Sequence, residues 1–178
     1  MRTMVTLEWL ESIYACDDGI EYYKTLDETN LLKILERCIL DDNLDYANWL
    51  IARCMDRKQR LRYALYAAES VLHIYENEHL NDNSPRMAIE AVKAVIKRDS
   101  KKNRDAAHAA AHAAAHDAAR VAASAAYAAA WAASYAAQSA AWAAHAARGA
   151  SHAASYAAAA DDVHMTDILR YGIEIIQI

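Results

Sequence analysis

Apolar residues recur at three- and four-residue spacing through the first 100 positions, which predicts a series of short amphipathic helices. Clusters of polar residues such as Asp41–Asn43 separate these repeats and predict turns. Asp56 is expected to start a longer helix. Ser84 followed by Pro85 predicts the start of the next helix, with serine as N-cap and proline in the first turn.

The N-terminal region predicts shorter elements. Thr6 is the expected N-cap of a helix that runs through Tyr14. Asp17–Gly19 is expected to interrupt this helix, and a second short helix is expected to follow and to end near Lys24. Asp27 is then expected to cap the helix that follows.

Residues 106–160 consist mostly of alanine, the strongest helix former, whose methyl group lets two helices approach closely. One continuous helix of this length would span about 80 Å, which is too long for a compact domain. We therefore predict two or three packed helices, with a break near Gly149. The larger side chains recur every three or four positions and fall in one stripe. This stripe contains Arg120, Ser124, Tyr127, Trp131, Tyr135, Gln138, Trp142, His145, Gly149, His152 and Tyr156.

The stripe has two interpretations. In the first, its large side chains fill the gaps that alanines leave on a facing helix, as in any close-packed interface. In the second, they line a groove or pocket, where aromatic faces stack on planar groups and arginine binds phosphate or carboxylate. The second interpretation predicts these ligand-binding residues: Arg120, Tyr127, Trp131, Tyr135, Trp142, His145, Arg148 and His152.

The composition favours an all-α fold, because the chain has one proline, three glycines and no phenylalanine. We predict a multi-helix bundle that forms one domain. Residues 1–104 supply short N-terminal helices, and residues 105–178 supply an Ala-rich, tightly packed helical part. Residues 100–103 are expected to form a loop, and residues 163–178 the last helix.

Charge and cysteine content narrow the class of protein. A formal net charge of −5 disfavours a nucleic-acid partner, which would require a concentrated basic excess. Three widely spaced cysteines predict free thiols in a reducing compartment. Because we find no signal-peptide pattern and the Ala-rich segment is too polar to span a membrane, we expect a cytoplasmic protein without a membrane partner. Alanine faces suit a second copy of the chain as well as packing within one chain, so a homo-oligomer stays open.

The sequence contains only weak indications of a catalytic site or a metal-binding site. His108, His112 and His116 step by four, but the outer two rotate apart on a helix, so we expect titrating surface histidines. Glu69 and Glu76 are expected to form ion pairs with arginines rather than to act as acid and base. The sequence therefore predicts no catalytic, metal or cofactor site. A separate structural expectation is that three charged residues hold the helices around Pro85 together: Glu69, Arg86 and Glu90.

Residues 62–76 and 81–91, followed by the Ala-rich segment with its Trp, His and Arg residues, carry a family resemblance. They resemble a family of immunity proteins found with bacterial polymorphic toxins and in prophages. The shared pattern is an Ala-x-Glu-x-Val-Leu helix, an acidic turn, Pro-Arg-x-Ala-Ile-Glu, and then Trp/Ala repeats. The resemblance covers about residues 56–160, and the sequence departs from it at Ala67 and Leu80, where relatives often carry cysteine and proline.

The resemblance implies a non-enzymatic immunity or inhibitor protein that binds and neutralises a toxin or defence effector. The aromatic stripe supports a second hypothesis, a small-molecule binding protein that sequesters a nucleotide-like immune signal, as a phage-encoded anti-defence protein would. An inhibitor predicts an exposed patch of Trp and Tyr, and an enzyme predicts two titrating groups in a cleft. A sequestering protein predicts a cavity enclosed by Trp131, Trp142, Arg120 and Arg148.

Overall fold

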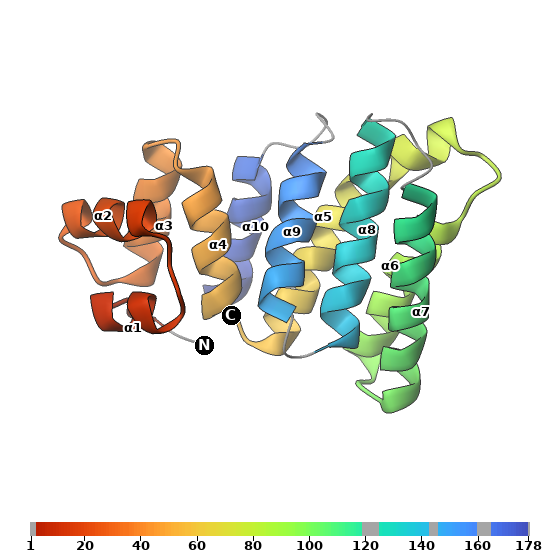
Figure 1. Cartoon of the computed structure of the whole chain (residues 1–178), viewed down its shortest axis with the longest axis horizontal. Helices are drawn as coiled ribbons and strands as arrows, with labels where there is room; N and C mark the ends of the chain where they lie inside the picture. The colour runs from red at the N-terminus through yellow and green to blue at the C-terminus, as the bar shows by residue number, and fades with distance from the viewer. Residues whose placement is uncertain (1–2, 119–124, 143–145, 160–164, 178) are drawn as a thin grey trace.

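A computed structural model describes residues 3–118, 125–142, 146–159 and 165–177, and in these residues it contains ten α-helices (Figure 1). The predicted all-α fold is confirmed. The extended pairing that the described residues contain is one isolated bridge between Met4 and Asn30. In chain order the helices are α1 (Leu7–Ser12), α2 (Asp17–Leu26), α3 (Leu31–Leu40), α4 (Leu44–Cys54), α5 (Arg57–Glu78), α6 (Ser84–Lys97), α7 (Lys101–Ala118), α8 (Ala125–Ala141), α9 (Ala146–Ala158) and α10 (Met165–Gln177).

The helices lie side by side in two layers, as Figure 1 shows. α4, α9, α8 and α7 form a row that faces the viewer, and α10, α5 and α6 lie behind it. α8 contacts α7 and α9 within its own layer, and α5 and α6 across the layers. The short helices α1, α2 and α3 lie at the α4 end of this array. In the described part of the chain, no helix is both long enough and apolar enough to cross a membrane.

Two predicted helix starts are confirmed. The Thr6 hydroxyl accepts a hydrogen bond from the Trp9 amide at 3.3 Å and caps α1, although this helix ends at Ser12 rather than Tyr14. Asp56 caps α5 in a reciprocal arrangement with Gln59. The Gln59 amide donates to the Asp56 carboxylate at 2.8 Å, and the Asp56 amide donates to the Gln59 side chain at 2.9 Å.

The ends of α2 differ from the prediction. Asp17 and Asp18 form the first turn of α2 rather than an interruption, because carboxylates stabilise the positive end of the helix dipole. Asp27 does not cap α3. It adopts a left-handed conformation with φ 46° that ends α2, and the Asn30 side chain accepts the first amides of α3 instead.

Two further boundaries shift by a residue or more. Ser84 is the first residue of α6, and Asn83 stands at the N-cap position before it. The predicted loop at residues 100–103 is also wrong beyond Ser100, because α7 already begins at Lys101. The Ser100 hydroxyl accepts the Asn103 amide at 3.2 Å, which supports the first turn of this helix.

The described residues of the Ala-rich segment lie in α7, α8 and α9, in agreement with the predicted two or three helices. α8 ends at Ala141 and α9 begins at Ala146, so a break lies near Gly149 as predicted, but Gly149 itself does not break the helix. Gly149 lies inside α9, at a point where this helix approaches α8 closely. A Cβ atom at Gly149 would lie 2.9 Å from the Ser139 Cβ and 3.0 Å from the Tyr135 carbonyl oxygen. The glycine therefore permits a close helix contact rather than a turn.

The core combines small and large side chains across the two layers. α5 contributes the fully buried side chains of Tyr63, Val71 and Tyr75 to the core, and this helix contacts α8 and α9. The facing helices contribute methyl groups that allow their backbones to approach. These buried alanines are Ala132, Ala133, Ala136, Ala137 and Ala140 of α8, and Ala150, Ala153, Ala154 and Ala157 of α9. The division of the chain at residue 104 stays a prediction, and that boundary falls inside α7.

Two ion pairs connect α5 with α6, the helices before and after the turn that precedes Pro85. Arg86 donates two hydrogen bonds to the Glu76 carboxylate, at 2.5 and 2.6 Å. Lys93 lies 2.9 Å from the Glu69 carboxylate of α5 and 2.7 Å from the Glu90 carboxylate of its own helix. Arg86 and Glu69 therefore join the two helices as expected, although Glu69 pairs with Lys93 rather than with an arginine. Glu90 pairs with Lys93 of its own helix and does not itself connect α6 to α5.

Candidate binding surface of aromatic and arginine side chains

The predicted stripe folds back on itself, because α8 and α9 lie side by side and run in opposite directions (Figure 1). Four half-buried rings meet where the two halves of the stripe adjoin. The Tyr135 ring stacks on His152 at 4.8 Å between centroids and on Tyr156 at 5.4 Å. The Trp131 ring lies 5.5 Å from Tyr135 and 6.0 Å from Tyr156. Trp131, Tyr135, His152 and Tyr156 are called the aromatic cluster below.

An exposed arginine of the same helix lies beside the aromatic cluster. Arg148 precedes His152 by one helical turn, and its Nε donates to the His152 Nε2 at 3.5 Å. The guanidinium is therefore within reach of any group that stacks on the outer ring of the cluster. This places four of the predicted ligand-binding residues in one place: Trp131, Tyr135, Arg148 and His152.

α4 adds a second arginine that sequence reasoning missed. The buried Asn48 side chain donates to the Ser151 carbonyl at 3.0 Å and to the Ser155 hydroxyl at 3.1 Å, which fixes α4 against α9. The next residue, Trp49, lies under the guanidinium of Arg53 at 3.8 Å from the ring centroid. The i, i+4 spacing of Trp49 and Arg53 is visible in the sequence, but the helix that α4 packs against is not.

The local electrostatics are cationic although the chain as a whole is acidic. Burial lowers the pKa of His152 from its usual value, and the charges of Arg148 and Arg53 lower it further. Burial, with a contribution from Arg60, also lowers the pKa of Arg53 to about 10. Among the described residues, no carboxylate forms an ion pair with Arg53 or Arg148. Arg148 is exposed and Arg53 is half-buried, so within the described part of the chain both charges can meet an external anion.

The other predicted ligand-binding residues do not join this surface or lie outside the described residues. Arg120 and His145 are outside the described residues, and so is the side chain of Tyr127. Trp142 is 43% exposed at the end of α8, where its ring contacts His108 of α7 at 4.7 Å. It lies seven residues, or about 10 Å of helix, beyond Tyr135.

His108 and His112 form a pair on α7. Their Nε2 atoms lie 3.1 Å apart, so one ring donates a hydrogen bond to the other. In the described residues, no group of three or more His, Cys, Asp or Glu side chains is arranged to hold a metal ion. The pair therefore gives no specific indication of metal chemistry.

We expect the stability of the protein to fall as pH is lowered through the range below 6.5, in part because of His152. Its pKa lies below 6.5 in the folded state, so the unfolded chain takes up this proton first, and its contribution to stability is present above pH 6.5 and lost below it. Urea denaturation at pH 7.5 and pH 5.5 should show a smaller loss for His152→Gln than for the parent. An equal loss in both proteins would contradict the assignment.

Comparisons with protein families, with curated proteins and with solved structures found no match to this chain. The resemblance to immunity proteins therefore stays a prediction. The function has to be inferred from the geometry and charge of the surface itself.

Proposed function

We propose that this protein acts by binding rather than by catalysis, and that it takes up an anionic ligand that carries a planar ring, such as a nucleotide. The observation that carries this proposal is the position of Arg53 and Arg148, without carboxylate partners among the described residues, beside the aromatic cluster. Guanidinium groups bind phosphate through paired hydrogen bonds. Aromatic faces stack on bases. The two kinds of group together match the two halves of a nucleotide.

The donors of the arginines support the same interpretation. Arg53 Nη1 donates to the Trp49 carbonyl at 3.1 Å, which uses one of the five N–H donors of this side chain. Stacking on Trp49 fixes the plane of the guanidinium without using its edges. The remaining donors can therefore meet a phosphate with little loss of side-chain freedom on binding.

A toxin or effector protein is the second candidate partner, in line with the resemblance to immunity proteins. Trp, Tyr and Arg side chains on a rigid surface dominate the binding energy of many protein interfaces. Trp142, which is partly exposed at the end of α8, offers a protein partner a separate aromatic contact outside the aromatic cluster. A protein partner would have to present acidic groups to Arg53 and Arg148, because buried like charges are strongly unfavourable.

The test is a titration of the full chain with nucleotides and cyclic dinucleotides. Binding is measured by the change in Trp fluorescence and by the shift in thermal unfolding. A ligand of this class at 100 times its Kd should raise the free energy of unfolding by about 2.7 kcal/mol. Arg148→Ala and Arg53→Ala should each weaken binding about tenfold or more, equivalent to about 1.4 kcal/mol. Arg98→Ala removes an exposed arginine that follows the C-terminal end of α6 and is not part of the proposed surface, so it should leave the affinity unchanged.

Two outcomes distinguish the candidates. If no compound of the panel binds, the nucleotide proposal is wrong, and immobilised protein should then be tested for capture of an acidic protein partner that Arg148→Glu no longer retains. If neither ligand nor partner depends on Arg53 or Arg148, the surface is not the recognition site.

A further inference from the structure

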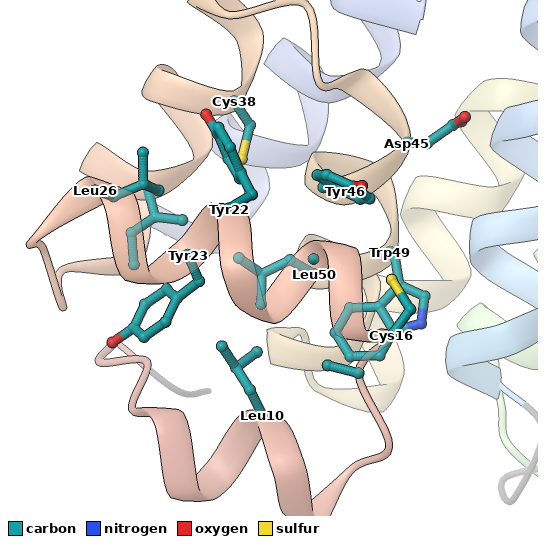
Figure 2. A pocket seen from close by; sticks show the side chains of 13 residues that line it. Leu10, Cys16, Tyr22, Tyr23, Leu26, Cys38, Asp45, Tyr46, Trp49 and Leu50 are labelled. Atoms are coloured by element: carbon teal, nitrogen blue, oxygen red, sulfur yellow. The ribbon is translucent and has the colours of Figure 1, made fainter.

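A second site lies at the other end of the molecule, where α1, α2, α3 and α4 enclose a cavity of about 210 Å³. Figure 2 shows side chains of these helices gathered around it, with Leu10 at the bottom, Cys38 at the top, and Cys16 and Trp49 at one side. The predicted ligand-binding residues of the Ala-rich segment take no part in it. Its lining residues are Leu10, Ala15, Cys16, Gly19, Tyr22, Tyr23, Leu26, Ile34, Cys38, Asp45, Tyr46, Trp49 and Leu50.

Two of the three tyrosines that line this cavity have hydrogen-bonded hydroxyl groups. The Tyr22 hydroxyl donates to the Asp41 carboxylate at 3.0 Å, and the Tyr23 hydroxyl donates to the Val5 carbonyl at 2.9 Å. Tyr22 and Tyr23 therefore offer their ring faces to the cavity rather than their hydroxyl groups. Burial raises the pKa of Tyr22 to about 12 and that of the Cys38 thiol to about 11, in keeping with a poorly hydrated interior.

Gly19 keeps the wall between α2 and α4 thin. Glycine is an unfavourable residue inside a helix, yet it stands in the first turns of α2. A Cβ atom at Gly19 would lie 3.1 Å from the Cys16 sulfur and 3.9 Å from the Tyr46 ring. A larger side chain at this position would occupy space that the cavity now leaves open.

We propose that this cavity binds a neutral aromatic molecule of one or two fused rings. An apolar cavity of roughly 150 Å³ is enough to hold benzene, so the larger volume here fits a molecule the size of indole or naphthalene. The described lining contains no lysine or arginine, and the Asp45 carboxylate stands at its edge, so an anionic ligand would lack a counter-charge. The aromatic rings of Tyr22, Tyr46 and Trp49 supply the stacking partners.

This site is separate in chemistry from the aromatic and arginine surface, because it selects against the negative charge that the arginines select for. Trp49 belongs to both sites, because its ring lines the cavity and also lies under the guanidinium of Arg53. A test of the cavity should therefore leave Trp49 unchanged. Gly19 meets this condition, because it lines the cavity and is distant in sequence from both arginines.

The first experiment titrates the full chain with 1-aminonaphthalene, which is neutral at pH 7.5 and fluoresces more strongly in apolar surroundings. We expect a saturable blue shift that indole and naphthalene reverse and that 1-naphthoate, a charged molecule of the same size, does not. Gly19→Leu should fill the cavity and weaken binding at least tenfold. Glu21→Leu adds the same side chain to an exposed position of α2 and should bind as the parent does.

A second readout uses the parent protein alone, so it does not depend on the folding of a variant. Cys16 is exposed and lines the cavity, whereas Cys38 and Cys54 are buried. Saturating indole should slow the alkylation of Cys16 by iodoacetamide at least fivefold. Absence of saturable binding, equal binding by Gly19→Leu, or an unchanged alkylation rate would each overturn the proposal. Sedimentation that shows a dimer lost in Gly19→Leu would instead assign the cavity to contact between two copies.

Discussion

Replacement of Asn48 by leucine should destabilise the protein by about 2–4 kcal/mol, although the two side chains have similar volumes. Asn48 is 1% exposed and accepts a hydrogen bond from the Tyr63 hydroxyl at 3.1 Å. Its amide also donates to Ser151 and Ser155 of α9. Leucine would leave the buried Tyr63 hydroxyl without its acceptor and the Ser155 hydroxyl without its donor, and each unsatisfied group costs about 1–3 kcal/mol. The loss would also loosen α4 from α9, and with it the position of Arg53.

Urea denaturation of the parent and of the variant measures this effect. Asn77→Leu is the matched control, because Asn77 is exposed on α5 and its replacement should change the free energy of unfolding by less than about 0.5 kcal/mol. Tyr63→Phe in the Asn48→Leu background should recover part of the loss, since it removes one of the orphaned hydroxyl groups. A variant as stable as the parent would show that the network does not stabilise the fold.

Gly149→Ala should destabilise the protein by about 1–2 kcal/mol even though alanine is the better helix former by about 1 kcal/mol. The new methyl group would meet the Ser139 Cβ at 2.9 Å and the Tyr135 carbonyl oxygen at 3.0 Å. Because a backbone atom cannot rotate away as a flexible side chain can, α9 would have to move from α8. The stacking of Tyr135 on His152 should weaken as a result.

Gly19→Ala is the matched control for this substitution. Its nearest neighbour would be the flexible Cys16 side chain at 3.1 Å, so the gain in helix propensity should leave the variant as stable as the parent or more stable. Thermal unfolding should show a lower Tm for Gly149→Ala, by about 2–4 °C per kcal/mol for a chain of this size. A Tm above that of the parent would mean that the two helices separate at little cost.

The close approach of α8 and α9 connects packing to the candidate surface. Buried alanines and Gly149 bring the two backbones together, so that rings projecting from adjacent edges reach stacking distance. With larger residues in the interface, the same rings would stand too far apart to stack. The Ala-rich composition therefore supports the proposed binding surface, because alanines and Gly149 make the close contact between α8 and α9. The binding interpretation of the stripe stays a proposal.

The candidate site was partly predictable. The spacing of Trp131, Tyr135 and His152 placed these residues on one stripe, and the structure brings them together in the aromatic cluster. The same spacing placed Trp142 with them, but α8 ends there and its ring meets His108 instead. Trp49 and Arg53 were missed because α4 is separated from α9 by about 100 positions, and nothing local indicates which helices become neighbours.

The sequence by itself determined the elements of this protein: the all-helical fold, the caps at Thr6 and Asp56, and the stripe of large residues among alanines. These features depend on contacts between residues three or four positions apart, which the order of amino acids specifies directly. Only the tertiary structure decided that Gly149 permits a helix contact, that Asn48 joins α4 to α9, and that four short helices enclose a cavity. Those features depend on which helix faces come together, and that choice is made by the packing of the whole chain.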